Sequence, residues 1–585
     1  MYFSKDELNV ISTTRSLKSI SQVAENVTVV TAAEIKLMNA HTLADVLNTV
    51  TGVQVFLTGG PGQLAMPYIQ GADKMNVTVL IDGVVLNNLS DNTADIGTVP
   101  VQMIEKIEII KGPASSAWGS ALGGVVNVIT KAGSLDHQGN MVSASFGKKN
   151  TDDFRAETMG KQDKVGYYLF AGRLQSDGLT QHFGVSDNNA YAKLTYGLTD
   201  NTDILFTLGY GRNSVGQGVD TVYDLTFDDI EERTLSTVAI NSLLSKDLEL
   251  NISIRTMQQA FTSKTTGAML ENDKYTDKGY GSGAKLTWKS AFNTVVFGAD
   301  YDNKSLKSTA IAGGEQGLIK SALYANDTIS MNKLSITPGI RYDSTSSNGD
   351  ITSPSLGITY SIANSTILRA YAANGFSIPT LFFTYGDNAS YMANPDLKME
   401  QVTSYQTGVE TAAVKYLWMK VSAFKNEIKD AFAYDTDPVT NIRTYVNSGR
   451  QRIEGFEVEM KTIPVYHTAL TAGAEFIDAK DLDTGLRLQD IPTRVYDIGL
   501  RYNDEKSFKA LLKGRYINWN AEPWYQGKYS SYVFDLNMIK NIYQHKDASL
   551  EAFLNVHNIF SNDQYLASIY QNPRQWLEGG LRYTF

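Results

Sequence analysis

From about Lys131 to its last residue the chain repeats one pattern, in which apolar and polar side chains alternate along segments of roughly ten residues. Residues 205–212, 334–343 and 496–503 are examples, and clusters of Asp, Asn, Gly and Ser separate such segments. Alternation with a period of two predicts strands that have one apolar and one polar face. No run of about 18 apolar residues occurs, so the sequence contains no candidate for a membrane-spanning helix.

The number of these segments predicts a closed membrane barrel. Residues 135–585, divided among about 22 strands, leave about 20 residues for each strand with its share of loop, and barrels of that size have a plugged lumen. The chain has 32 Tyr and 23 Phe, and aromatic residues near many segment ends fit the girdles of such a barrel. Mean hydropathy is −0.22, as expected where lipid-facing and lumen-facing residues average out. The sequence therefore predicts a transmembrane β-barrel of about 22 antiparallel strands.

Residues 27–134 have a different residue pattern, which predicts a small α+β domain. Residues 31–34 and 42–45 each form a capping box that opens a short helix. Residues 104–111 and 124–130 predict two strands, and the segment between them is rich in Gly, Pro, Ala and Ser. A domain of this size fits inside the lumen of the predicted barrel as a plug.

Several stretches resemble the TonB-dependent outer-membrane receptors. Residues 104–131 resemble the end of the family's plug domain, and residues 42–55 (TLADVLNTVTGVQV) resemble its helix-to-strand signature. Residues 447–459 and 555–560 resemble a mid-barrel strand and the penultimate strand of that family. The alternating last strand ends on the aromatic Phe585, which resembles the signal by which bacterial outer-membrane barrels are recognised for insertion. The resemblance implies a receptor in the bacterial outer membrane, surrounded by lipid and expected to be a monomer.

Residues 1–26 predict an extended N-terminal segment, part of which resembles the TonB box of this family. The resemblance implies TonB as a partner, driven by an inner-membrane complex that uses the proton-motive force. Pairing with TonB as an added strand requires exposed backbone. A disordered tail with a chance aliphatic pair is the alternative. The residues of the box are Asp6, Glu7, Leu8, Asn9, Val10, Ile11 and Ser12.

The resemblance also implies ionic contacts between the plug and the barrel wall. Gln70 stands where the family usually carries Arg, so one expected contact is in doubt. Lys111 occupies the second basic position of the family pattern. Glu457 and Glu459 share one strand face, which in the family faces the lumen, so they are candidate partners of Lys111. The alternative is that both glutamates only line a wet wall.

Two polar loops of the plug and one extracellular loop of the barrel are the candidate cargo site. In the family, the loops that correspond to residues 56–64 and 84–95 face outward and contact the cargo. Turn chemistry is the plain alternative, since Gly, Asn and Asp dominate turns in all proteins. The candidate residues are Gly60, Pro61, Gln63, Leu64, Asn87, Asn88, Asp91, Tyr385 and Tyr391.

The identity of the cargo stays open between two metal complexes. Plug length, the position of the box and residues 62–64 resemble the cobalamin-receptor branch, which implies a corrinoid and a possible Ca²⁺ site on Asp-rich loops. Oxygen ligands suit Ca²⁺, although a solvated acidic loop is the alternative. A ferric siderophore, bound by aromatic and cationic side chains, fits nearly as well. The candidate Ca²⁺ ligands are Asp220, Asp224, Asp228 and Asp229.

Composition argues against several other functions. The chain has no Cys and six scattered His, which disfavours haem or zinc capture, and no cofactor other than Ca²⁺ is expected. Its formal charge of −10 argues against nucleic acid as a partner. We find no nucleophile–base pattern that suggests an enzyme. The remaining rivals are a diffusion porin, which predicts no folded plug, an adhesin with the same barrel but no transport, and a secreted β-rich enzyme.

Overall fold

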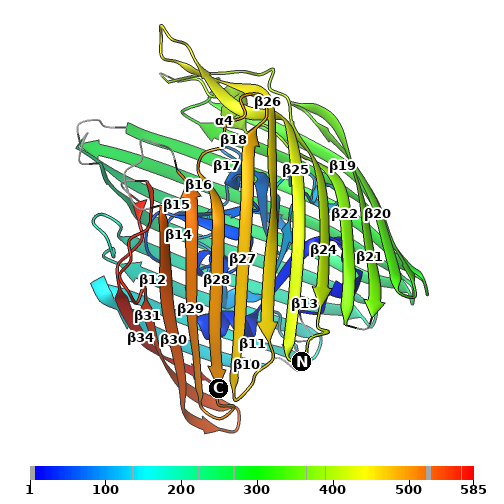
Figure 1. Ribbon diagram of the computed structural model, residues 1–585, viewed down its shortest axis with the longest axis vertical. Helices are drawn as coiled ribbons and strands as arrows, with labels where there is room; N and C mark the ends of the chain where they lie inside the picture. Colours follow the sequence, from blue (N-terminus) through cyan, green and yellow to red (C-terminus); the bar gives the residue numbers. More distant parts are fainter. Residues whose placement is uncertain are drawn as a thin grey trace.

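The computed structural model describes residues 7–134, 138–220, 224–267, 271–363, 365–388, 390–521, 529–567 and 570–585. In these residues, 22 antiparallel strands follow one another around a closed barrel, and the last strand pairs with the first. The result confirms the predicted fold class (Figure 1). None of the helices in the described ranges is long and apolar enough to cross a membrane.

The wall strands are longest on one side of the barrel and shortest where it closes. Their bounds are β10 (Gly139–Gly147), β11 (Thr151–Gln162), β12 (Val165–Ser176), β13 (Val185–Thr199), β14 (Thr202–Asp220), β15 (Leu225–Ser245), β16 (Leu248–Gly267), β17 (Glu271–Lys289), β18 (Asn293–Ser308), β19 (Glu315–Met331), β20 (Leu334–Thr345), β21 (Gly349–Ala363), β22 (Thr366–Ser377), β24 (Glu400–Thr411), β25 (Leu417–Thr436), β26 (Arg443–Thr462), β27 (Thr468–Asp481), β28 (Ile491–Asn503), β29 (Phe508–Asn520), β30 (Ser530–His545), β31 (Ala548–His557) and β34 (Trp576–Thr584). A helix, α4 (Leu381–Tyr385), and short strands β23 (Tyr391–Met392), β32 (Tyr565–Ala567) and β33 (Tyr570–Gln571) lie in two of the loops.

The two faces of the wall differ as the alternation predicts. On β11, Phe154 is 43% exposed and faces outward, while its neighbour Asp153 is 5% exposed and faces the lumen. Successive side chains of a strand point to opposite faces, so every wall strand presents an apolar row to lipid and a polar row to the interior.

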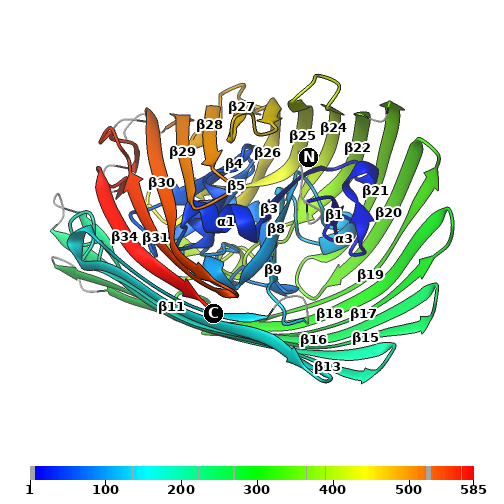
Figure 2. The same cartoon turned by 90° about the horizontal axis from the view of Figure 1, so that it is seen from below.

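The N-terminal part of the chain lies inside the barrel, as the view from below shows (Figure 2). Its central five-stranded sheet has the order β3-β8-β9-β6-β7. The elements of this plug are β1 (Asn9–Val10), β2 (Lys18–Ser19), η1 (Ile20–Gln22), β3 (Asn26–Thr31), α1 (Ala32–Met38), α2 (Leu43–Leu47), β4 (Val53–Leu57), β5 (Ala65–Ile69), η2 (Lys74–Asn76), β6 (Val77–Ile81), β7 (Val84–Val85), η3 (Val101–Met103), β8 (Ile104–Lys111), α3 (Ser115–Trp118) and β9 (Gly124–Thr130).

Local sequence explains the start of both larger plug helices. The Thr31 side chain accepts a hydrogen bond from the Glu34 amide, and the Glu34 carboxylate accepts one from the Thr31 amide, which is the predicted capping box. Asp45 accepts bonds from the backbone amides of His41 and Thr42 at the start of α2. Leu43 and its apolar neighbours in α2 are fully buried against the sheet, so the plug has a core of its own.

Candidate functional site

The plug is locked to the barrel wall around Glu457 on β26. Lys111 Nζ lies 2.8 Å from Glu457 and 3.0 Å from Glu459, and the Lys111 side chain is completely buried. Burial opposes the charge of Lys111, but the two carboxylates outweigh it and raise the pKa of the ammonium. Gln70 donates to Glu457 at 2.7 Å and Asn26 donates to it at 3.0 Å. Gln70 therefore occupies the expected Arg position as a neutral donor, and Asn26 is a partner that sequence reasoning missed.

The box residues are folded against the plug. Asp6 lies outside the described residues. Val10 is fully buried, and the Glu108 carboxylate accepts bonds from the Ile11 amide at 2.9 Å and the Ser12 amide at 2.8 Å. The Ser12 hydroxyl donates to the same carboxylate at 2.5 Å, and Trp118 donates its ring N–H to the Ser12 carbonyl at 2.6 Å. In this arrangement the box has little free backbone for an incoming strand.

Barrel side chains hold the segment that follows the box. Arg15 lies 2.6 Å from Asp300 of β18 and stacks on Trp118 with its guanidinium 4.9 Å from the ring centre. Lys18 is buried and donates to Thr337 of β20 at 2.8 Å. Burial lowers the pKa of the Lys18 ammonium to about 8. Two strands of the wall thus retain the N-terminal segment next to the plug.

Most of the candidate cargo residues of the plug loops shape the loops themselves. Gln63 is fully buried and donates to the carbonyls of Phe183 at 2.7 Å and Gly184 at 3.2 Å, in a barrel loop. The Asn87 side chain accepts from the Val79 amide at 2.9 Å. Asn88 donates to the Thr93 carbonyl at 3.1 Å, and Asp91 accepts from the Thr93 amide at 3.0 Å. Gly60 packs against Leu179 and Pro573, Pro61 lines a cavity described below, and Leu64 accepts from Thr58. Contact with cargo at these positions stays a prediction.

An extracellular loop of the barrel rests on the second plug loop. The Leu381 and Phe382 amides at the start of α4 donate to the carbonyls of Leu89 and Ser90, at 3.1 and 3.2 Å. Tyr385, at the end of α4, packs against an apolar cluster that includes Leu306 and Ile311. The loop therefore covers the plug from outside, at the upper end of the barrel in Figure 1.

Beyond α4 the same loop joins an aromatic platform. Tyr391 stacks on Tyr445 of β26 with ring centres 5.8 Å apart and planes 7° apart. The Arg443 guanidinium lies 5.9 Å from the Tyr391 ring centre and 5.1 Å from that of Tyr434, which is 57% exposed. These four side chains, the Tyr391 platform, present aromatic faces and one cation at the end of the barrel that carries α4.

Two cavities lie between the plug and the barrel wall, the upper one against β27–β31 and β34 and the lower one against β22 and β24–β29. The upper one, of about 270 Å³, reaches from Gly59 and Pro61 of the first plug loop, beside Trp519 and Tyr570, down to α2. The lower one, of about 260 Å³, continues to the box residue Glu7. Six residues line both cavities: Met38, Thr49, Thr471, Asp497, Gly499 and Lys513. All plug residues that line either cavity come from residues 7–61.

The four candidate Ca²⁺ ligands do not form one group. Asp228 lies 3.1 Å from His182, and Asp229 is its neighbour on β15, where successive side chains face opposite ways. Asp220 ends β14 and Asp224 precedes β15 in a left-handed conformation. In the part of the chain that the structure describes, no three His, Cys, Asp or Glu side chains are arranged to hold a metal ion.

The chain matches two protein-family models. The model of the "TonB dependent receptor-like, beta-barrel" matches residues 130–559, and the "TonB-dependent Receptor Plug Domain" model matches residues 19–125. Among curated proteins, the vitamin B12 transporters BtuB of Vibrio vulnificus strains YJ016 and CMCP6 are 24% and 26% identical over 505 and 509 residues. Each alignment covers 81% of this chain and 78% of the relative.

Solved structures of the same architecture cover nearly all of the chain. The siderophore receptor PirA of Acinetobacter baumannii superposes with a TM-score of 0.78 at 16% identity, covering 96% of this chain and 98% of that one. BauA, the ferric preacinetobactin receptor of the same species, superposes with a TM-score of 0.80 at 14% identity, covering 99% of both chains. At these identities the likeness shows the fold.

Proposed function

Because this chain belongs to the family of TonB-dependent outer-membrane receptors, we propose that it imports a cobalamin-like corrinoid across the bacterial outer membrane. The two cavities between the plug and the barrel wall carry the transport part of the proposal, since they form an interrupted path from the outer loops to the box. The two vitamin B12 transporters that align with most of the chain support a corrinoid as the cargo.

In this function the plug works as a gate with two coupled ends. Cargo binds between the first plug loop and the aromatic wall of the upper cavity, beside Trp519 and Tyr570. Binding favours a state in which the box leaves Glu108, which is a shift between two conformations of one protein. TonB then adds a strand along the box and pulls. The cargo passes unchanged, because no bond in it is made or broken.

A ferric siderophore is the second candidate cargo. The Tyr391 platform favours it, because aromatic faces and an Arg guanidinium suit a planar, anionic chelate. This platform lies on the extracellular side, away from the upper cavity with Trp519, so the two candidates place the cargo against different side chains.

A binding titration distinguishes the two. Purified protein is titrated with cyanocobalamin and with a panel of ferric siderophores, and the fluorescence of its six Trp is recorded. We expect saturable quenching by cyanocobalamin that weakens in W519F and is unchanged in Y391A. Saturation by a ferric siderophore alone, lost in Y391A, would replace the corrinoid by the second candidate.

Cell uptake tests the transport itself. Deletion of the box, residues 6–12, is expected to abolish uptake of labelled cargo while leaving its binding to whole cells intact. Uptake that survives this deletion would contradict TonB-driven transport and would leave a passive pore.

A further inference from the structure

The barrel closes between its two shortest strands. Among the described wall strands, β10 and β34 have nine residues each, whereas β15 has 21. Their register runs from Met141 opposite Thr584 to Gly147 opposite Glu578. Every other neighbouring pair of wall strands is joined directly by its connecting loop. This pair is brought together only when the whole wall has curved round, and closing so long a loop opposes the pairing entropically.

The inner face of this seam carries charge on both sides and small side chains in the middle. Ser143 of β10 lies opposite Arg155 of β11 on one side and Arg582 of β34 on the other. Arg155 pairs with Asp153 on its own strand, and Arg582 pairs with Glu551 of β31. Across the described residues, no ion pair runs directly from β10 or β11 to β31 or β34. Glu578 of β34 reaches the Ser145 hydroxyl of β10, but no pair of opposite charges in the described parts of these strands joins the two sides.

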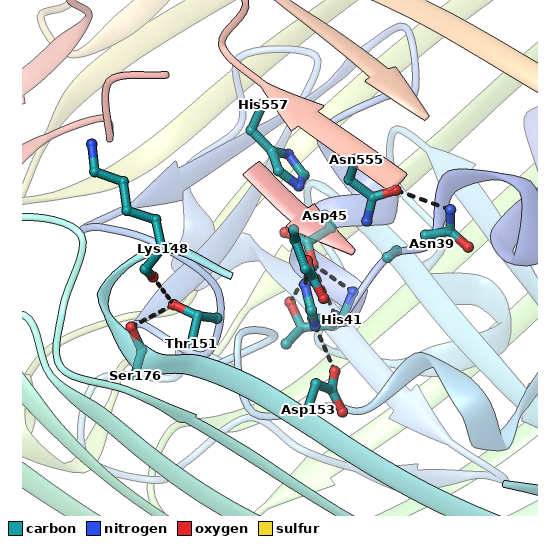
Figure 3. A network of polar contacts seen from close by, with 12 residues as sticks. Asn39, His41, Asp45, Lys148, Thr151, Asp153, Ser176, Asn555 and His557 are labelled. Carbon is teal, nitrogen blue, oxygen red and sulfur yellow. Dashed lines mark hydrogen bonds and ion pairs between the residues drawn. The ribbon is translucent and has the colours of Figure 1, made fainter. Parts of the chain in front are cut away.

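One side chain of the plug spans the gap. His41 Nδ1 lies 2.5 Å from Asp153 Oδ2 of β11, and His41 Nε2 lies 2.8 Å from Glu578 Oε2 of β34. The imidazole is 3% exposed, so it lies between two buried carboxylates that belong to opposite sides of the seam. Figure 3 shows His41 directed at Asp153 from the turn between α1 and α2.

The rest of the same turn extends the bridge. Asn39 donates to Asn555 of β31 at 3.0 Å and accepts from Arg582 of β34 at 3.1 Å. On the other side of the seam, Arg155 of β11 donates to the Ala40 carbonyl at 3.1 Å. Lys36 adds an ion pair to Glu551 at 3.0 Å. Within residues 36–41, four residues therefore contact three wall strands, β11, β31 and β34, that lie on both sides of β10.

We propose that residues 36–41 act as a clasp that holds the barrel closed across the β10–β34 seam. The plug then has a structural task in addition to gating: residues 36–41 add ion pairs and hydrogen bonds that join the two sides of the short seam. His41 is a positioning residue in this clasp, since it acts through the two carboxylates that it joins. The Lys111–Glu457 contact does not hold the barrel closed in this way, because β26 and its neighbouring strands are already joined by short loops.

Two variants weaken the clasp in different ways. H41Q removes the cation between Asp153 and Glu578. N39G removes the hydrogen bonds to β31 and β34 but leaves no buried charge unpaired, and Gly suits the left-handed backbone of Asn39 at φ 46°. The readout is the temperature at which the purified protein in detergent loses its compact gel mobility, which reports opening of a closed barrel. We expect H41Q to lower this temperature by about 5 °C or more and N39G by about 2 °C.

A disulfide across the seam distinguishes the proposed clasp from a general effect of these variants on stability. Ala144 and Leu581 are partners across β10–β34, and Leu581 is 51% exposed on the lipid side, away from the plug. Antiparallel partners have Cα atoms about 4.5–5.5 Å apart, within the range that a disulfide accepts. The chain has no other Cys, so A144C/L581C forms a defined cross-link. In the oxidised pair, H41Q and N39G are expected to have no effect on the opening temperature.

K111M is the matched control, since it removes a plug cation from wall strands on another side of the barrel. Its effect should be the same with and without the seam disulfide. The proposal is overturned if H41Q and N39G lower the opening temperature equally in the cross-linked chain. It is also overturned if neither variant lowers that temperature in the chain without cysteines.

Discussion

At the residue scale, the contact at Glu457 combines one ammonium with two amides. A single charge on the plug side keeps the carboxylate paired, while Gln70 and Asn26 satisfy its remaining acceptor sites. A buried carboxylate without such partners would be strongly destabilising. The arrangement explains why a neutral Gln is tolerated at Gln70, where the sequence pattern led us to doubt the contact.

Removal of Lys111 tests this contact. K111M leaves Glu457 buried with only neutral donors, so we expect the free energy of unfolding to fall by about 3–5 kcal/mol. Chemical denaturation in detergent, followed by Trp fluorescence, measures the change. R450M is the control, because Arg450 is 62% exposed in its pair with Asp483 and should show no measurable change. Equal stability of K111M and the parent chain would contradict the assignment of this lock.

The charge of His41 makes one contribution to stability depend on pH. Burial disfavours the imidazolium, but Glu578 and Asp153 outweigh burial and raise its pKa to about 10, with Arg155 also in contact. The folded pKa exceeds the unfolded value of about 6.5, so this stabilisation is complete below pH 6.5 and is lost as pH rises through about 10. The difference in opening temperature between the parent chain and H41Q should therefore shrink between pH 6.5 and 10. A difference that grows with pH would contradict this sign.

At the element scale, the Glu108 carboxylate holds strand β1, which is part of the box, in its docked position. Glu108 accepts three hydrogen bonds from Ile11 and Ser12, and strand β1 is too short to be stable without them. Bonds to a charged acceptor are stronger than bonds to a neutral one. The charge of Glu108 is thus a main determinant of how often the box is free.

A neutral replacement should release the box more often. E108Q keeps the size of the side chain but is expected to lose about 1–2 kcal/mol of docking free energy, which raises the released population about 5- to 30-fold. The measurement is the rate at which a maleimide labels V10C, since Val10 is fully buried when docked. E105Q makes the same change on the same strand, and no hydrogen bond in the described residues joins Glu105 to the box. A labelling rate in E108Q no higher than in E105Q would rule out this role.

The strands and helix starts could be predicted from the sequence, whereas the contacts between plug and wall could not, and both outcomes have physical reasons. Alternation along the chain predicts wall strands because every lipid-facing side chain must be apolar, and the capping boxes of residues 31–34 and 42–45 are local signals. The partners of His41 could not be found in this way, since Asp153 and Glu578 lie 112 and 537 residues away in sequence. A period of two predicts which side chains face the lumen, but it contains no information on which plug residue lies opposite. The family resemblance places Gln63 in a plug loop that contacts cargo, and its bonds to the barrel-loop carbonyls of Phe183 and Gly184 could not be read from the sequence.

At the scale of the whole molecule, the plug has one part that lines the two cavities and one part that does not. Residues 7–61 provide all the plug lining of both cavities, while the strands from β5 onward contain most of the central sheet. Movement of the first part alone would join the cavities. The second part could stay in place during import.

Cross-links at two places test this division. T51C/G473C ties the first part to β27, because a Cβ on Gly473 would lie 3.1 Å from the Thr51 Cβ. S115C/G375C ties the second part to β22, because a Cβ on Gly375 would lie 3.0 Å from the Ser115 Oγ. We expect oxidation to stop uptake of labelled cargo in T51C/G473C, reversibly on reduction, and to leave at least half of it in S115C/G375C. Equal loss in both pairs would mean that the whole plug must move.

The burial of Val10 has a consequence for a membrane that holds many copies of this receptor. In the function proposed above, a box that stays docked against the plug in the idle state cannot occupy TonB. Empty copies then do not compete with loaded ones, by simple mass action. Under that proposal, many unoccupied copies can stand in one membrane without reducing the amount of TonB that is free for loaded copies.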